Sequence, residues 1–176
     1  MLGAAAPTAG SIGIVSLSSL RARATVATLA AALGLMTVIA PVAAATPQSV
    51  TIVSHVTFNP NGPNSGDFTT TGQATDSGLI CGVGTFVDTG IRFAGFQSPR
   101  GTVQLQVDKA FTCGDGSGTF FVKMQIHANF NTGIESFSWV IKGGTGDYDM
   151  LQGSGSGATV PADGGNVNTF IGFLIG

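Results

Sequence analysis

The segment Thr119-Phe-Phe-Val-Lys-Met-Gln-Ile-His-Ala-Asn-Phe130 decides the fold class of this chain. The odd-numbered positions are mostly polar, and Phe121 is the one large apolar side chain among them. The even-numbered positions are all apolar: Phe120, Val122, Met124, Ile126, Ala128 and Phe130. Because successive side chains of a β-strand point to opposite faces, this alternation predicts a strand with one apolar and one polar face.

The difference between the two faces indicates which one lies inside. Hiding the apolar face from water gains roughly 1.5–3 kcal/mol for each large side chain. We therefore expect Met124 and Ile126 to point into the core. Lys123 and His127 should then point outward. Phe121 would lie on the outer face, where it marks a patch that another subunit covers.

Similar alternation recurs in short segments along the chain. Turns rich in Gly, Asn, Asp and Pro separate these segments, as expected for tight reversals. They are Val50–Phe58, Phe68–Thr75, Leu79–Val87, Ile91–Phe96, Thr102–Cys113, Ile134–Ile141, Gly153–Val160 and Val167–Ile175. The spacing predicts an all-β fold, a closed antiparallel β-barrel of about eight strands, because closure removes exposed sheet edges.

Composition excludes several classes of protein. Charged residues make up 9% of the 176 residues, and Gly and Phe number 27 and 12. From Thr46 onward the chain has five Lys or Arg against nine Asp or Glu, so it lacks the basic footprint of a nucleic-acid-binding protein. The chain is also too apolar and too aromatic to be disordered.

The first 45 residues have the pattern of a secretory signal peptide. Arg21 and Arg23 precede the uncharged run Ala24–Ala40, and Pro41 then breaks this run. Small residues before Thr46 suit signal peptidase, so we expect cleavage between Ala45 and Thr46 and a secreted, extracellular protein with no membrane attachment afterwards. An uncleaved anchor helix is the alternative, although 17 apolar residues are short for a membrane span.

The predicted signal is long, and its first 19 residues carry no charge. A translation start at Val15 or Leu20 would shorten it to 31 or 26 residues, close to or within the usual range of about 15 to 30. The remainder, 46–176, is expected to form a single barrel domain.

Cys81 and Cys113 are the two cysteines of the chain. Export would bring them to an oxidising compartment, where a disulfide is expected. Alternation places Cys113 on the apolar face of its segment, and places Cys81 on an apolar face with Leu79, Val83 and Val87. The bond should contribute on the order of 3–4 kcal/mol in the loop-entropy model. A metal site would need more Cys or His ligands than the sequence offers, so we expect no metal.

His55 and His127 are the only imidazoles, and both fall on polar strand faces. If the apolar faces line the barrel, both are outside and solvated. If the polar faces line the lumen, the two become candidate acid–base or ligand-binding residues. Nothing in the spacing ties a Ser to either histidine, so a hydrolase has the least support.

Lys109 is an anomaly, because alternation places it on the face of Val107 and Phe111, where an unpaired ammonium is costly. A bulge near Asp108 could turn Lys109 outward, which is the explanation we favour. Lys109 could also reach the barrel mouth, or it could serve as a lumen cation for an anionic ligand. Arg92 has a similar ambiguity, so both residues are candidate ligand-binding groups.

A family resemblance rests on the segment Trp139-Val-Ile-Lys-Gly-Gly-Thr-Gly-Asp-Tyr-Asp-Met-Leu-Gln-Gly-Ser-Gly-Ser-Gly157. It resembles the strand, glycine corner, aromatic residue and Gly-rich strand of the allene oxide cyclase and dirigent superfamily. Phe111–Phe120 and Gly84–Asp88 look like the bacterial secreted branch of that group. The resemblance implies an eight-stranded barrel, often trimeric, with an internal pocket. Its plant members isomerise a fatty-acid epoxide or steer phenoxy-radical coupling, without a metal or a cofactor.

The glycine corner also has a structural interpretation. Gly143, Gly144 and Gly146 let the chain reverse where a Cβ would clash. We expect Tyr148, with Met150 and Leu151, to form a short turn that plugs one end of the barrel. The glycines lack the context of either nucleotide-binding fingerprint, so they are interpreted as structural.

Two functions remain open. The first is a secreted barrel that binds or shapes a small apolar molecule in its lumen; any catalysis would come from confinement, as in a cofactor-free isomerase, a cyclase or a protein that directs radical coupling. The alternative is a non-catalytic surface or matrix protein that acts through exterior oligomer contacts. The 12 Phe favour a filled barrel, because eight strands enclose room for side chains or for one small ligand.

Overall fold

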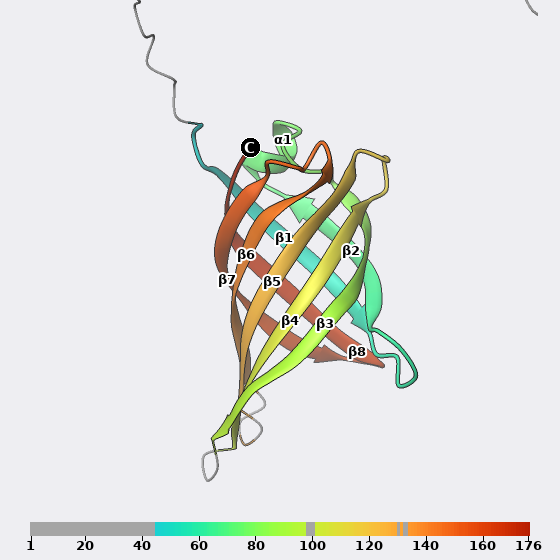
Figure 1. Cartoon of the computed structure of the whole chain (residues 1–176), viewed down its shortest axis with the longest axis vertical. Helices are drawn as coiled ribbons and strands as arrows, with labels where there is room; N and C mark the ends of the chain where they lie inside the picture. Colours follow the sequence, from blue (N-terminus) through green and yellow to red (C-terminus); the bar gives the residue numbers. More distant parts are fainter. Residues whose placement is uncertain (1–44, 98–100, 130, 132–133) are drawn as a thin grey trace, which may run out of the picture. The chain divides into compact units, whose positions relative to one another are not determined.

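The computed structural model describes residues 45–97, 101–129, 131 and 134–176. These residues form a closed antiparallel barrel in which each strand pairs with its neighbours in sequence and β8 pairs with β1 (Figure 1). The strands are β1 (Gln48–Thr57), β2 (Ser65–Thr71), β3 (Val83–Gln97), β4 (Thr102–Cys113), β5 (Gly118–Asn129), β6 (Ile134–Gly146), β7 (Gln152–Ala162) and β8 (Gly165–Ile175). The predicted fold class is confirmed. The predicted signal segment, apart from Ala45, lies outside the described residues, as does Phe130.

Three predicted segments differ from the structure. Leu79–Val87 and Ile91–Phe96 are not separate strands, because Val83–Gln97 is one strand with register shifts between Asp88 and Gly90 and between Phe93 and Gly95. Phe68–Thr75 is not a single strand either: β2 ends at Thr71, and the short helix α1 (Gln73–Asp76) follows. Bulges explain the first difference, since they interrupt the alternation without ending the strand.

The predicted orientation of β5 is confirmed. Met124 and Ile126 are buried inside the barrel, whereas Lys123 and His127 are exposed. Phe121 is 46% exposed on the outer face. The apolar side of this strand therefore lines the barrel interior.

The predicted face of the segment around Cys81 is wrong in part. Cys81 is buried, but Val83 and Val87 are exposed, and Phe86 and Asp88 point inward instead. The reason is that β3 begins only at Val83, so alternation counted from Cys81 does not continue into the strand.

Aromatic side chains fill much of the interior. Phe111 stacks on Phe120 with ring centroids 5.0 Å apart, and Phe68 meets Phe111 edge to face at 5.1 Å. Glycines of β7 face two further rings of the interior: a Cβ at Gly155 would lie 2.8 Å from the Trp139 ring, and one at Gly157 would meet the Phe137 ring. The Gly-rich run is therefore a strand whose small residues make room for aromatic packing.

One end of the barrel is closed. Cys81 and Cys113 form the predicted disulfide there, with Cα atoms 5.9 Å apart. The Tyr148 hydroxyl lies 2.7 Å from Ser117 Oγ and 3.3 Å from Cys113 Sγ, a disulfide sulfur that can only accept a hydrogen bond. Tyr148 and Leu151 are buried as expected, but Met150 is 70% exposed and takes no part in the plug.

The corner before Tyr148 needs its glycines. Gly143 and Gly146 have φ angles of 83° and 63°, which favour glycine. A Cβ at Gly144 would lie 2.9 Å from the Phe120 Cα.

In the described part of the chain, no helix is long and apolar enough to cross a membrane.

Candidate functional site

The open end of the barrel, where β1 ends and β8 begins, holds a cavity of about 220 Å³. We call it the mouth cavity. Its apolar lining comes from Val56, Phe58, Ile91, Leu105, Val107, Met124 and Ile126. Its polar lining comes from Asn64, Asp88, Lys109, Glu135, Thr159, Asn166 and Asn168. The cavity is thus amphipathic, with an apolar wall and a cluster of charged and amide groups.

A buried ion pair anchors the polar side of the mouth cavity. Lys109 Nζ lies 2.5 Å from Asp88 Oδ1, and the two side chains are 3% and 5% exposed. Asn64 Nδ2 donates to the other Asp88 oxygen at 3.1 Å. Lys109 Nζ also lies 4.5 Å from the centre of the Phe86 ring, within the range of a cation–π contact.

The favoured prediction that a bulge turns Lys109 outward is therefore wrong. A bulge does occur nearby, but it lies on β3 after Asp88, and β4 continues in register through Lys109. Asp88 and Lys109 are direct cross-strand partners. The carboxylate offsets the cost of burying the ammonium, which explains how Lys109 remains inside.

Glu135 lies at the edge of this cluster, and its side chain is half-buried. Burial raises the pKa of the Glu135 carboxyl, while Thr159 and the positive charge of Lys109 act in the opposite direction. Burial lowers the pKa of the Lys109 ammonium, against the attraction of Asp88 and Glu135. The Glu135 carboxyl and the Lys109 ammonium thus lie at one cavity, and burial disfavours the charged form of each.

Amide and hydroxyl groups complete the polar side. Thr159 Oγ1 donates to Asn168 Oδ1 at 2.9 Å across the β7–β8 pair. Thr159 has one hydroxyl proton, so it serves either Asn168 or Glu135 at a given moment. Ser54, opposite Asn168 on β1, is buried with no hydrogen-bond partner for Oγ in the described structure, but it does not line the cavity.

The other predicted site residues lie outside the barrel. His55 is 56% exposed and contacts Asp67 Oδ2 at 3.1 Å. His127 is exposed on β5. Arg92 is 71% exposed and lies 4.0 Å from an oxygen of Asp108. Of the four candidates, the structure brings only Lys109 to the mouth cavity, and it does not bring the two histidines together as an acid–base pair.

Sequence reasoning missed Asp88 and Glu135, although a signal for each was present. Glu135 alternates with Phe137, Trp139 and Ile141, so the same counting that placed Lys109 inside also places Glu135 there. Asp88 alternates with Gly84 and Phe86, but the incorrect start of the strand concealed this pattern.

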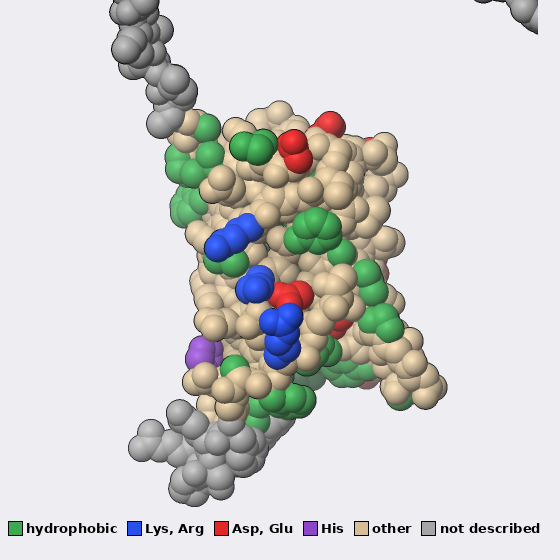
Figure 2. Space-filling view, in the orientation of Figure 1, with side chains coloured by type: hydrophobic (Ala, Val, Ile, Leu, Met, Phe, Trp, Pro, Cys, Tyr) green, Lys and Arg blue, Asp and Glu red, His purple; other side chains and the backbone are tan. Residues whose placement is uncertain are grey.

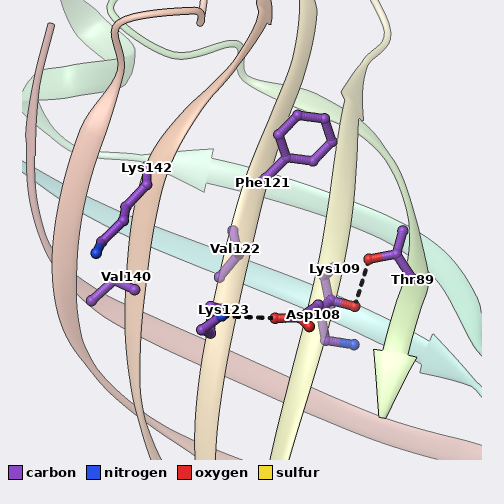
Figure 3. Close-up of a pocket in the computed structure, with 8 residues that line it drawn as sticks. All are labelled: Thr89, Asp108, Lys109, Phe121, Val122, Lys123, Val140 and Lys142. Atoms are coloured by element: carbon purple, nitrogen blue, oxygen red, sulfur yellow. Dashed lines mark hydrogen bonds and ion pairs between the residues drawn. The ribbon is translucent and has the colours of Figure 1, made fainter.

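A second concave surface lies on the outer wall, with a volume of about 380 Å³ (Figures 2 and 3). We call it the outer groove, and its lining is Thr89, Asp108, Lys109, Phe121, Val122, Lys123, Val140 and Lys142. Nowhere in the described residues do three or more His, Cys, Asp or Glu side chains gather as a metal site would require.

Comparisons with known proteins give no assignment. No protein-family model matches the chain, and no curated protein or solved structure gives a significant match. The resemblance to the allene oxide cyclase and dirigent superfamily stays a prediction.

Proposed function

We propose that this protein is a secreted binding barrel whose mouth cavity takes one small molecule with an apolar body and a hydroxyl head. The observation that carries the proposal is the division of the lumen. Aromatic rings fill it toward the disulfide end, whereas the other end keeps a cavity of about 220 Å³ around Lys109, Asp88 and Glu135. The disulfide between Cys81 and Cys113 is compatible with export.

The size of the cavity limits the ligand. An apolar cavity of about 150 Å³ in an engineered protein holds benzene, and drug-sized pockets begin at about 300 Å³. The mouth cavity lies between these values, so it suits a molecule with a single substituted ring or a short branched chain. Val107, Met124 and Ile126 supply the apolar wall against which such a body would pack.

The charges of the cavity select the head group. Asp88 and Glu135 would repel a carboxylate, and the ammonium of Lys109 would repel an amine. A hydroxyl group both donates and accepts hydrogen bonds. It would donate to Glu135 and accept from Lys109, which has N–H groups beyond the one that Asp88 takes.

The proposal is tested by titrating the ¹⁵N-labelled protein with p-cresol and, in parallel, with toluene, which lacks the hydroxyl. We expect saturable shifts of the Val107, Met124 and Ile126 amides, with p-cresol binding at least about fivefold more tightly, the equivalent of about 1 kcal/mol for a net hydrogen bond. Ile126→Phe should block the cavity and abolish these shifts. No saturable shift at these amides with either compound would overturn the proposal.

A matched variant tests the role of the polar cluster. Removing Lys109 alone would strand a buried carboxylate, so both partners are replaced in Asp88→Leu/Lys109→Met. The double variant should fold and keep toluene binding but lose the preference for p-cresol. An unchanged preference would show that the ion pair does not recognise the hydroxyl.

A second candidate is a surface or matrix protein that acts through exterior contacts between copies. Its support is an apolar stripe on the outer face of β8, where Ile171, Phe173 and Ile175 are 59%, 59% and 40% exposed. Sedimentation over a range of protein concentrations tests it. If this candidate is right, the protein forms an oligomer, and Phe173→Lys dissociates that oligomer. A protein that stays monomeric at every concentration would eliminate this candidate.

A further inference from the structure

The outer groove is separate from the lumen. Its residues come from β3, β4, β5 and β6, and Figure 3 shows Phe121 and Lys142 on adjacent strands. Between the groove and the lumen stands the barrel wall, whose inward side chains here include Val122 and Ile141, each 2% exposed. Lys109 lines both hollows, but its ammonium is buried against Asp88, so a molecule in the groove would not reach the charged cluster of the mouth cavity.

Two β-bulges flank the groove. Phe120 pairs with Gly144 and Val122 with Ile141, so Phe121 alone faces two residues of β6, Lys142 and Gly143. On the other flank, Asp88 pairs with Lys109 and Gly90 with Asp108, which leaves Thr89 as the extra residue of β3. Thr89 Oγ1 donates to the Asp108 carbonyl at 3.1 Å. A bulge bends its strand and changes the direction of nearby side chains. The two bulges therefore account for the concave shape of the wall and for the side chains that line it.

Positive charge gathers on this wall. Of the four Lys and Arg side chains described, Arg92, Lys123 and Lys142 lie on the outside near the groove, and the fourth is inside the barrel. Asp108 is the carboxylate of the groove; it lies 3.9 Å from Lys123, and 4.0 Å from Arg92. Lys142 has no ion pair within the described part of the chain, and Figure 2 shows Lys and Arg side chains gathered on one face of the molecule.

This arrangement is notable in a chain with an excess of acidic residues. From Thr46 onward nine Asp or Glu outnumber five Lys or Arg, yet the groove has more cations than carboxylates. Phe121, 46% exposed, and Val140 provide an apolar surface beside the two lysines. A local positive field beside an aromatic ring suits a ligand that combines a negative group with a flat apolar body.

We propose that the outer groove binds a small amphipathic anion, namely an aromatic carboxylate. The ring of the ligand lies against Phe121 and Val140, and the carboxylate lies between Lys123 and Lys142. The volume of about 380 Å³ is within the range of drug-sized pockets and suits one or two fused rings. Lys142 is the main anchor, because it is not engaged by Asp108.

The test compares 2-naphthoate with 2-naphthalenemethanol, a neutral probe with the same rings, by titration of the ¹⁵N-labelled protein. We expect 2-naphthoate to shift the amides of Phe121, Lys123 and Lys142 in a saturable way. The neutral probe should bind at least about threefold more weakly, and added salt should reduce this difference.

Variants localise the site. Lys142→Gln should weaken 2-naphthoate binding about two- to fivefold, as expected for one exposed charge pair. Phe121→Ala should weaken the binding of both probes, and Asp108→Asn should strengthen that of 2-naphthoate. Phe93→Ala is the matched control: Phe93 is 82% exposed and does not line the groove, so its loss should leave both affinities unchanged.

Four results would overturn the proposal. They are no saturable binding, equal affinity for the two probes, an unchanged affinity in Lys142→Gln, or shifts confined to mouth-cavity amides such as that of Met124. A fifth result would assign the groove to a second copy of the chain: its amides would shift with protein concentration alone, and Lys142→Gln would abolish this change. None of these outcomes bears on whether p-cresol binds at the mouth cavity.

Discussion

The two ends of this barrel are built from the same eight strands, but one is densely packed and closed, whereas the other is polar and holds a cavity. At the closed end, a disulfide and buried Tyr148 and Leu151 cover rings that pack at centroid distances near 5 Å. At the open end, the interior turns polar, and an ion pair and three amide side chains line a cavity. Dense aromatic packing stabilises a fold, whereas a hollow polar end adds little stability, so the contrast indicates where binding is to be sought.

The largest expected effect lies at the closed end. Phe111 is fully buried and packs against four other rings, so Phe111→Ala should lower the free energy of unfolding by about 3–5 kcal/mol. Urea melts measure this loss. Phe93→Ala, which removes a ring that is 82% exposed, should change it by less than about 0.5 kcal/mol. Equal losses in the two variants would contradict the filled-core description.

The next effect concerns the ion pair of the open end. Asp88→Asn would leave the Lys109 ammonium buried without its counter-charge, and should cost about 3–5 kcal/mol. Replacing both partners in Asp88→Leu/Lys109→Met should restore most of this loss, since an apolar pair avoids the cost of removing two charges from water. If the double variant is as unstable as Asp88→Asn, the two side chains do not act as a coupled pair.

A smaller contrast tests the two faces of β5. Ile126 faces the mouth cavity and is 7% exposed, so Ile126→Ala should destabilise by about 2–5 kcal/mol, near the lower end because an adjoining cavity already exists. His127→Ala, on the exposed face, should be nearly neutral. Urea melts of both variants check this order, and a greater loss in His127→Ala would reverse the assignment of faces.

Much of the fold could be predicted because alternation is a local property. β4 has the predicted bounds, Thr102–Cys113, and the apolar face of β5 is inside as expected. β3 could not be delimited in this way. The loop before Val83 and two register shifts break the period of two, and the shifts depend on pairing with β4 rather than on the segment itself.

The candidate site was predictable only in part. The position of Lys109 on an inner face followed from alternation, but its partner did not, because Asp88 comes from a strand 21 residues earlier. The closed and open ends look alike in sequence: both consist of turns rich in Gly, Asn and Asp. Which end stays hollow depends on how the rings of several strands pack together, and no single segment contains that information.

The smallest expected effect is the pH dependence contributed by Glu135. Burial raises the pKa of its carboxyl in the folded protein, so the folded state holds this proton more tightly than the unfolded chain does. The protonated carboxyl therefore contributes to the stability of the fold below the ordinary pKa of a glutamate. This contribution is lost as the pH rises through the raised pKa of Glu135, because the folded state must then release the proton. Glu135→Gln keeps the shape and removes the titration. The variant should therefore match the wild type near pH 4 and exceed its melting temperature at pH 7, while Asp163→Asn, at an exposed carboxylate, should follow the wild type at both. If the wild type instead gains stability over Glu135→Gln between pH 4 and pH 7, the attraction of Lys109 outweighs the cost of burial, and Glu135 would be a fixed anion of the mouth cavity and a stronger acceptor for a ligand hydroxyl.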